Sequence, residues 1–312
     1  MIPVWNGLKM EEEIHRAIVE VYNSFPFKGY MDGNEPKYLW ISKILLREAP
    51  RGSRVLDVGC GPCDLTAILA RLGYQMVGVD DLKDPWHLVG DNRKRIMDFA
   101  QRSGITLMVE PIEKASLKQN SFDATLLIDI LEHYPNPRFL LNRVISALKP
   151  SGLLLIGTPN AVALAKRVFV VMGKSNYPNV NFVYFNVGDY RGHVREYTVE
   201  ELKRILKLSG LTEVTVKLTN HDIQGLLRKS RGLRKLVTGA YLFISSLYPK
   251  FRASIIIYGR KPEGWRPISD LDAIEHLKVH YPHVVKYNLD GEPDELLIKK
   301  LKSRLCNPTS IS

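Results

Sequence analysis

The chain has 312 residues, 45% apolar and 25% charged, which excludes a disordered or fibrous protein and predicts a globular one with a full α/β core. Three cysteines form no disulfide framework, no signal peptide begins the chain, and no uncharged apolar run approaches the ~20 residues that span a bilayer. We therefore expect a cytoplasmic protein, and the net charge of +11 indicates an anionic partner.

Two amphipathic helices are predicted first, over residues 10–24 and 36–48. Their apolar residues recur at helical spacing and include Ile14, Ile18, Val21, Leu39, Trp40, Ile44 and Leu45. Helices in this position can cover a ligand or simply pack on the sheet behind them. The sequence leaves both interpretations open.

The stretch from Arg54 to Thr66 predicts a buried strand, a glycine turn and the start of a helix. Gly59 and Gly61 allow the backbone to approach a ligand closely, because neither has a Cβ. A second buried strand over 75–80 ends in Asp80, whose carboxylate can reach a ribose diol. The unit is therefore predicted to bind a nucleoside.

Charge indicates which nucleoside the turn accepts. A dinucleotide site places a pyrophosphate at the start of the helix and favours a third small residue there. Here that position is Cys63, with Asp64 beside it and Asp57 at the strand end, and these carboxylates would repel a phosphate but attract a cation. S-adenosylmethionine fits, because it carries a ribose, an ammonium and a sulfonium but no phosphate.

These residues resemble motif I of the class I methyltransferases, Asp-x-Gly-x-Gly, with Asp80 in the motif II position. Cys63 makes the turn bulkier than is usual in that family, but we expect binding to be kept. After a strand over 105–109, Pro111 stands where the family normally has an acidic residue, so only Ile112 is carried over there. The resemblance implies S-adenosylmethionine contacts from Asp57, Gly59, Cys60, Gly61, Asp80, Asp81, Ile112 and Asp129.

One rival interpretation uses the same residues. Cys60-Gly61-Pro62-Cys63 has the spacing of the thioredoxin redox motif and also follows a strand and opens a helix. However, the first cysteine lies between the two glycines of a nucleoside loop. We therefore treat redox chemistry as secondary to methyl transfer.

The segment after the fourth strand carries the next candidate residue. This strand, over 121–129, is followed by Leu-Glu-His133, similar to the Asp-Val-Leu-Glu-His of small-molecule class I methyltransferases. Ligands of open α/β sheets bind at the carboxyl ends of the strands, so His133 is a candidate base or acceptor contact. A capping or packing role for His133 is the alternative. Further predicted elements are helices over 91–103 and 138–148 and a fifth strand over 153–157.

Regular spacing breaks over residues 161–195, which hold an apolar helix-like piece and an aromatic loop. His193, Arg195 and Tyr197 then match a His-x-Arg-x-aromatic pattern of many relatives, and alternation would place all three on one side of an extended segment. They either line the acceptor pocket or hold the loop in place. A capping box at Thr198 begins a helix that ends near Leu208, and a sixth strand follows over 213–218.

Residues 219–252 separate the sixth strand from the seventh, which covers 253–258. Between residues 223 and 261 there are nine Lys and Arg and no acid, interleaved with aliphatic and aromatic side chains. This composition suits an interfacial segment on an anionic membrane. The alternatives are a cap helix that buries its apolar face over the pocket, and an RNA-binding surface.

Together these elements predict an α/β protein with the doubly wound, seven-stranded, Rossmann-like sheet of the class I methyltransferases. We expect a methyltransferase domain over 1–261, with cap insertions at about 159–195 and 219–252. A helical extension over 262–312 follows, with helices over 269–280 and 293–305 and a role in packing or dimerisation.

The resemblance implies in-line transfer of the S-adenosylmethionine methyl group to an O, N or C atom of a small or lipid-like acceptor. Candidate catalytic residues are His133, His193, Arg195 and Tyr197, and no metal-ligand cluster is evident. An RNA methyltransferase, a non-catalytic cofactor-binding protein and a nicotinamide oxidoreductase are the alternatives. An RNA methyltransferase of the base-amine type would carry an Asn/Asp-Pro-Pro-aromatic motif after the fourth strand, whereas this chain has Asp129-Ile-Leu-Glu there.

Overall fold

The computed structural model describes residues 3–281 and residue 299, in two units, Met1–Trp265 and Arg266–Ser312. In the second unit, helix α11 (Asp270–His280) begins at Ser269, whose side chain and that of Asp272 form a capping box. The predicted helix over 293–305 lies outside the described residues, apart from Lys299.

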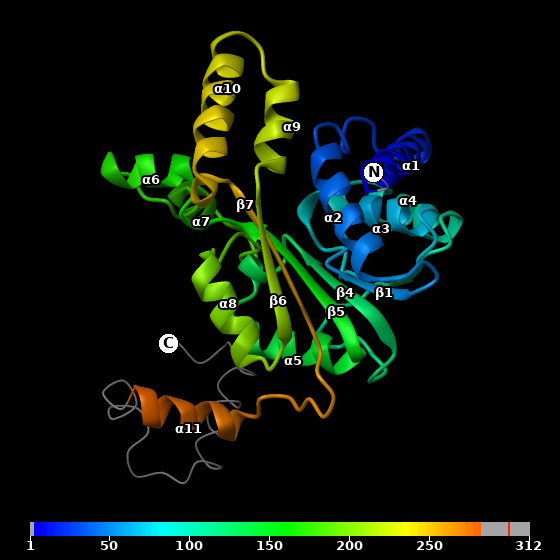
Figure 1. Cartoon of the computed structure of the whole chain (residues 1–312), viewed down its shortest axis with the longest axis vertical. Helices are drawn as coiled ribbons and strands as arrows, with labels where there is room; N and C mark the ends of the chain where they lie inside the picture. The colour runs from blue at the N-terminus through cyan, green and yellow to red at the C-terminus, as the bar shows by residue number, and fades with distance from the viewer. Residues whose placement is uncertain (1–2, 282–298, 300–312) are drawn as a thin grey trace. The chain divides into compact units, whose positions relative to one another are not determined.

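The first unit contains one seven-stranded sheet, in the order β3-β2-β1-β4-β5-β7-β6 (Figure 1). Its strands are β1 (Arg54–Val58), β2 (Gln75–Val79), β3 (Thr106–Met108), β4 (Phe122–Ile128), β5 (Leu148–Pro159), β6 (Thr212–Thr219) and β7 (Ser254–Arg260). Only β7 runs antiparallel to its neighbours, β5 and β6. This mixed order confirms the predicted doubly wound, Rossmann-like sheet.

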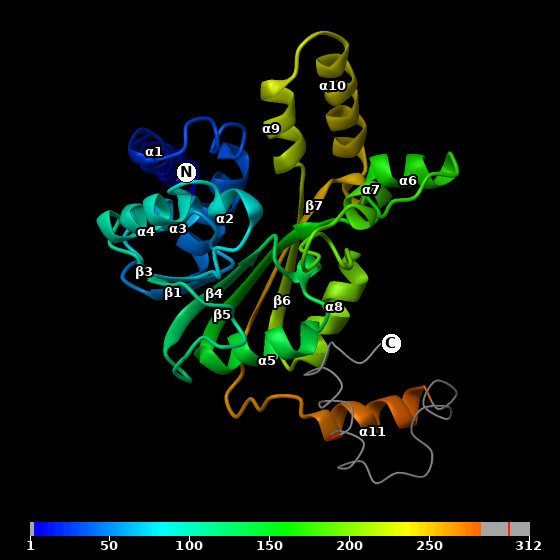
Figure 2. The same ribbon diagram turned by 180° about the vertical axis from the view of Figure 1, so that it is seen from behind.

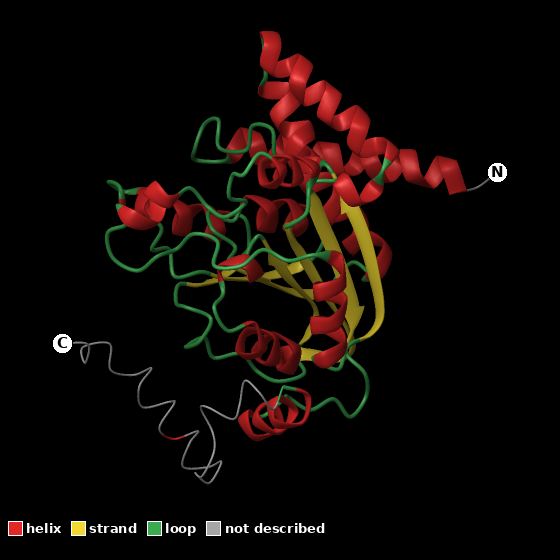
Figure 3. Ribbon diagram, turned by 90° about the vertical axis from the view of Figure 1, so that its left-hand side faces the viewer, coloured by secondary structure: helices red, strands yellow, loops and turns green. Residues whose placement is uncertain are grey.

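Helices cover both faces of the sheet (Figure 3), because each central strand is apolar on both sides. In β1, Val55 joins one core cluster, whereas Leu56 and Val58 join the other. One cluster is shared with α1 (Pro3–Ser24), α2 (Glu35–Glu48), α3 (Asp64–Arg71) and α4 (Asn92–Arg102), and the other with α5 (Pro137–Ala147) and α8 (Val199–Leu208). Both N-terminal helices therefore pack on the sheet.

Strand order fixes where a ligand can bind. From β1 the chain proceeds outward through β2 and β3, and then returns to the other side of β1 as β4. The carboxyl ends of β1 and β4 therefore flank the point at which the order reverses. Open α/β sheets bind their ligands in the crevice at this point.

Two insertions extend beyond this frame and stand apart from the sheet in Figures 1 and 2. The first, between β5 and α8, contains α6 (Leu164–Val171) and α7 (Val180–Tyr184), the latter within the predicted aromatic loop. The second, between β6 and β7, is a helical hairpin of α9 (His221–Lys229) and α10 (Gly232–Leu247). Within the described part of the chain, every helix is too short or too polar to cross a bilayer.

Candidate active site

The glycine turn after β1 is held open on one side. Gly59 has φ of +69°, and a Cβ there would come within 1.9 Å of Ile130 Cδ1, so packing requires glycine. Gly61 has φ of +51°, and a Cβ there would meet no atom within 4 Å. Gly59 therefore closes the turn onto the protein, whereas Gly61 leaves open space for a ligand.

The two cysteines of this turn are packing residues. Cys60 Sγ lies against β2, where a Cβ on Gly78 would approach it to 2.7 Å. Cys63 caps α3 in a left-handed conformation, and its Sγ lies 3.8 Å from Cys60 Sγ. The hydrogen bond from Cys63 and burial raise the pKa of the Cys60 thiol well above its usual value. A redox-active cysteine usually has a lowered pKa, so this shift argues against the thioredoxin interpretation.

The Asp80 carboxylate lies at the rim of the turn and orders it. One oxygen accepts from the Gly61 N–H at 2.9 Å and the other from the Leu82 N–H at 2.7 Å, while burial raises its pKa. Asp57, by contrast, is almost fully buried and accepts from Thr66 Oγ1 at 2.6 Å, and burial raises its pKa to about 7. Through Thr66, Asp57 stabilises the first turn of α3. Its direct contact with a cofactor stays a prediction.

The Asp81 carboxylate is engaged by the first insertion. Arg191 donates to both Asp81 oxygens, at 2.9 and 3.0 Å, and through Nε to Asp84 at 2.6 Å. Burial would raise the pKa of Asp81, but the Arg191 bonds hold it below its usual value. The sequence does not reveal Arg191, because only the folded chain brings residues 81 and 191 together.

The N-terminal segment adds side chains that sequence analysis also missed. Lys37 Nζ at the start of α2 lies 3.1 Å from Asp129 Oδ2, and Tyr38 donates a hydrogen bond to Asp64. In the loop before α2, the Tyr30 ring lies 5.3 Å from that of Trp86. Helix α2 therefore both packs on the sheet and supplies side chains to the end of β4 and the glycine turn.

Two further residues bear on whether an adenosyl group fits here. His87 is buried in the short helix η1 (Pro85–Leu88), and neither of its ring nitrogens has a partner among the described residues. Burial lowers its pKa, although the Asp80 charge opposes that shift. Ile112 is a buried apolar side chain. A carboxylate, an unpartnered imidazole and the open space over Gly61 fit a ligand that carries a ribose diol.

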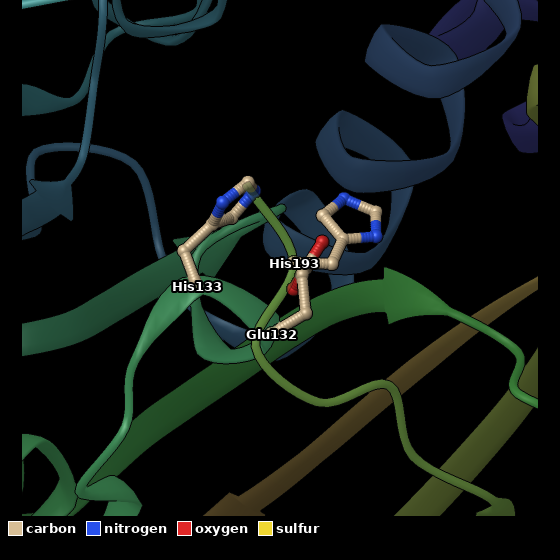
Figure 4. A group of neighbouring side chains, drawn as sticks. All are labelled: Glu132, His133 and His193. Carbon is tan, nitrogen blue, oxygen red and sulfur yellow. The ribbon is translucent and has the colours of Figure 1, made fainter. Parts of the chain in front are cut away.

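A second group of polar side chains gathers at the end of β4, where the turn η2 (Leu131–His133) carries Glu132 and His133. The Glu132 carbonyl accepts from the Val194 N–H at 2.7 Å and the Arg195 N–H at 3.1 Å. These bonds bring His193 to η2, with its ring centroid 4.8 Å from that of His133. Figure 4 shows the two imidazoles and the Glu132 carboxylate turned toward one another.

Hydrogen bonds assign the protons of both imidazoles. His193 Nδ1 lies 2.9 Å from Glu196 Oε1, and His133 Nδ1 lies 2.8 Å from the Arg191 carbonyl. Because each partner is an acceptor, each Nδ1 carries the proton and each Nε2 of a neutral ring is left as a base. The Glu196 bond raises the pKa of His193, whereas burial lowers that of His133. His193 is therefore the stronger base.

Glu132 is fully buried beside both rings. One oxygen accepts from Thr158 Oγ1 at 2.9 Å, and the other has no partner among the described residues. Burial and the nearby Asp129 charge raise the Glu132 pKa to about 7. Glu132, His133 and His193 each offer one ligand atom, all within 4.8 Å, so the group could hold a metal ion. Sequence spacing does not reveal it, because His193 lies far along the chain.

A cavity of about 620 Å³ adjoins this group, lined by His133, His193, Glu196, Arg191 and side chains of residues 176–190. Of the three residues in the His-x-Arg-x-aromatic pattern, only His193 lines this cavity. Arg195 is exposed and pairs with Glu201 at 2.6 Å, and its guanidinium lies 5.7 Å from the ring centroid of the buried Tyr197. Arg195 and Tyr197 thus lie side by side, as the alternation predicts, while the bonds from the Val194 and Arg195 N–H groups to the Glu132 carbonyl hold His193 at η2.

Comparison with known proteins identifies the family of this domain. Residues 33–216 match the family model described as a methyltransferase domain. The chain is 35% identical over 131 residues to a ubiquinone biosynthesis O-methyltransferase of Xanthomonas axonopodis pv. citri, which covers 41% of this chain and 52% of that protein. The protein of the same name from Xanthomonas campestris pv. campestris strain B100 is 34% identical over 129 residues, with the same coverage. The chain thus spans about half the length of these relatives.

Solved structures with similar folds include a Haemonchus contortus phosphoethanolamine N-methyltransferase 2 bound to S-adenosylhomocysteine. It is 19% identical, with a TM-score of 0.49, and the match covers 71% of this chain and 52% of that one. A Thermotoga maritima methyltransferase, a possible histamine N-methyltransferase, is 16% identical with a TM-score of 0.48. That match covers 78% of this chain and 99% of the other.

Proposed function

The chain belongs to the methyltransferase domain family, and we propose that it methylates a hydroxyl oxygen of a small aromatic acceptor seated in the 620 Å³ cavity. The observation that carries this proposal is the Glu196–His193 pair at the cavity wall. A hydroxyl is a poor nucleophile until its proton is removed, and an imidazole oriented by a carboxylate is suited to remove it.

S-adenosylmethionine, the cofactor of this domain, supplies an electrophilic methyl group on a sulfonium. The Asp80 carboxylate would bind the ribose hydroxyls, which its position at the rim of the turn supports, and the adenosyl group would take the open space at Gly61. Arg191 ties the cofactor side to the acceptor side, because its side chain holds Asp81 while its backbone carbonyl holds His133. Holding nucleophile and methyl in line can supply about 7–11 kcal/mol of the barrier.

The proton of the acceptor passes to His193 Nε2 as the acceptor oxygen forms its bond to the methyl carbon and the carbon–sulfur bond breaks. The products are a methyl ether, S-adenosylhomocysteine and a protonated His193. Glu196 stabilises the imidazolium, and Lys166 holds Glu196 in turn. Such general-base assistance contributes about 10²–10⁴-fold to the rate.

The wall of the cavity supports an aromatic acceptor. Tyr177, Phe182 and Tyr190 line it beside three asparagines, so rings can stack while amides bind polar substituents. Its volume lies in the usual range for small-molecule sites. The Xanthomonas relatives are named as O-methyltransferases, which agrees with a hydroxyl oxygen as the methylated atom.

The test is to incubate the protein with S-adenosylmethionine and a set of phenols and catechols that bear different side chains. The matched controls are the corresponding anilines. We expect S-adenosylhomocysteine and a methyl ether from at least one phenol and no product from its aniline. Methylated anilines without any methyl ether would contradict the proposed acceptor class while leaving the methyltransferase assignment intact.

A further inference from the structure

Helix α10 exposes a continuous apolar stripe. Its apolar side chains recur every three or four residues and so lie on one face: Leu233, Leu236, Val237, Ala240, Phe243, Ile244 and Leu247. All are exposed, Leu236 by 70%, and the buried residues of the helix are Thr238 and Ser245. Helix α10 therefore does not bury this apolar face over the pocket, whereas α9 of the same insertion packs against α2. The stripe has no cover within the described chain.

The first insertion repeats this pattern. Neither α6 nor α7 contains a buried residue. Both helices are nevertheless largely apolar, and Val171 is 87% exposed. Their exposed apolar side chains are Val168, Phe169, Val170, Val171, Met172, Val180, Phe182, Val183 and Tyr184. An amphipathic helix is normally stabilised by burying its apolar face, and here that burial is missing.

Specific contacts join the two insertions. The Arg167 guanidinium of α6 lies 5.6 Å from the Phe251 ring centroid, and within the second insertion the Phe251 carbonyl accepts from the Tyr241 hydroxyl of α10 at 3.0 Å. Asn160, just before α6, donates to the Arg252 carbonyl at 2.8 Å. Figures 1 and 2 both show α6 beside the base of α10. We call α6, α7 and α10 together the rim.

The charge of the rim has one sign. Residues 161–188 contain three cations and no acid, and residues 223–261 contain nine cations and no acid. Lys174, Arg234 and Lys235 are exposed, and none has an ion-pair partner within the described residues. Arg234 and Lys235 lie on the same helix as the uncovered apolar stripe but outside it, and exposed cations together with exposed apolar side chains are the features that bind an interfacial helix to anionic lipid.

We propose that the rim docks on the surface of an anionic membrane, with the α10 stripe entering the interface and the neighbouring cations binding lipid head groups. This goes beyond the proposed chemistry and does not depend on the acceptor. RNA would use the same cations but would leave Leu236, Phe243 and Leu247 in water, so the exposed apolar residues favour lipid. Because Phe182 of α7 belongs to both the rim and the cavity wall, the cavity would open next to the membrane.

Flotation with liposomes tests the proposal. We expect the full chain to float with vesicles that contain phosphatidylglycerol, not with pure phosphatidylcholine, and to be released by salt. Arg234→Gln/Lys235→Gln should weaken binding to the anionic vesicles by about 30-fold, at about fivefold for each cation. Leu236→Ser/Phe243→Ser should weaken it by at least about tenfold, because two apolar side chains lose their burial.

Matched variants elsewhere on the chain serve as controls. Lys203→Gln/Lys207→Gln on α8 removes the same charge, and Leu8→Ser/Val19→Ser on α1 removes comparable exposed apolar surface. Both should bind vesicles as the wild type does. Unchanged melting temperature and S-adenosylhomocysteine affinity verify that each variant is folded. Absence of flotation on anionic vesicles at low salt overturns the proposal, as does tighter binding to a short single-stranded RNA that Leu236→Ser/Phe243→Ser leaves unchanged.

Discussion

The cofactor turn and the acceptor cavity are built in different ways. The turn between Gly59 and Cys63 is short, largely buried and ordered by backbone hydrogen bonds to β2 and to the Asp80 carboxylate. The cavity wall comes from an insertion whose helices bury nothing, and a few side-chain pairs attach it, among them Arg191–Asp81 and Lys166–Glu196. Donor binding and acceptor chemistry therefore reside in separable parts of the molecule, so substitutions should affect one without the other.

The largest expected effect is on the acceptor side. His193→Ala removes the base and should lower kcat by about 10²–10⁴-fold. Calorimetry should find the affinity for S-adenosylhomocysteine unchanged, because His193 belongs to the cavity wall and not to the glycine turn. A parallel loss of cofactor affinity would show that the two parts are not separable.

On the cofactor side, Asp80→Asn should weaken S-adenosylhomocysteine binding by roughly ten- to a hundredfold, because a charge-assisted hydrogen bond to the ribose is lost. Asp81→Asn is the matched control, since the Asp81 carboxylate is already occupied by Arg191. We expect it to have little effect on cofactor affinity. Equal losses in the two variants would restore the prediction that both carboxylates bind the cofactor.

The Glu196–His193 pair should appear in the pH dependence of the rate. Only neutral His193 accepts a proton, and Glu196 raises its pKa, so the rate should fall as the pH drops through a midpoint above the ordinary value of 6.5. In Glu196→Gln the negative charge is gone, and the midpoint should move to lower pH by about one unit. A midpoint that stays in place would mean that Glu196 does not position the base.

The smallest effect is expected at the cysteines. Because the pKa of Cys60 is raised, its thiolate is scarce at neutral pH. In a Cys306→Ser background, alkylation of the folded protein by iodoacetamide should be at least about tenfold slower than that of the unfolded chain, since each pKa unit removes tenfold of the thiolate. Alkylation as fast as in the unfolded chain would revive the redox interpretation.

Sequence patterns predict the part of the molecule that is local. The strand, glycine turn and helix around Gly61, and the approximate bounds of most strands, follow from apolar periodicity and turn residues within a short window. β5 is longer than predicted, because Leu148 already pairs with Phe122 ahead of the continuous register with β4. The apolar pattern predicts the regular part of the β4–β5 pairing, but it does not predict the irregular pair at the start of β5.

The acceptor site depends on contacts between distant residues, which no local pattern contains. Arg191 reaches Asp81, Lys37 reaches Asp129, and the Glu132 carbonyl turns the segment that carries His193. For that reason His193 lies at the cavity, whereas Arg195 stacks on Tyr197 away from it. The conformation of a loop is set by the contacts that hold it, so the directions of its side chains do not follow the two-residue alternation of a strand.

A crystal structure of the protein with S-adenosylhomocysteine would show whether the glycine turn holds the donor while the cavity faces its sulfur. We expect the adenosyl group to lie over Gly61 with its ribose hydroxyls on Asp80, while Arg191 still holds Asp81. The thioether sulfur should face the cavity on the side of His193 Nε2. A cofactor bound away from Asp80, or a sulfur turned away from His193, would contradict this arrangement.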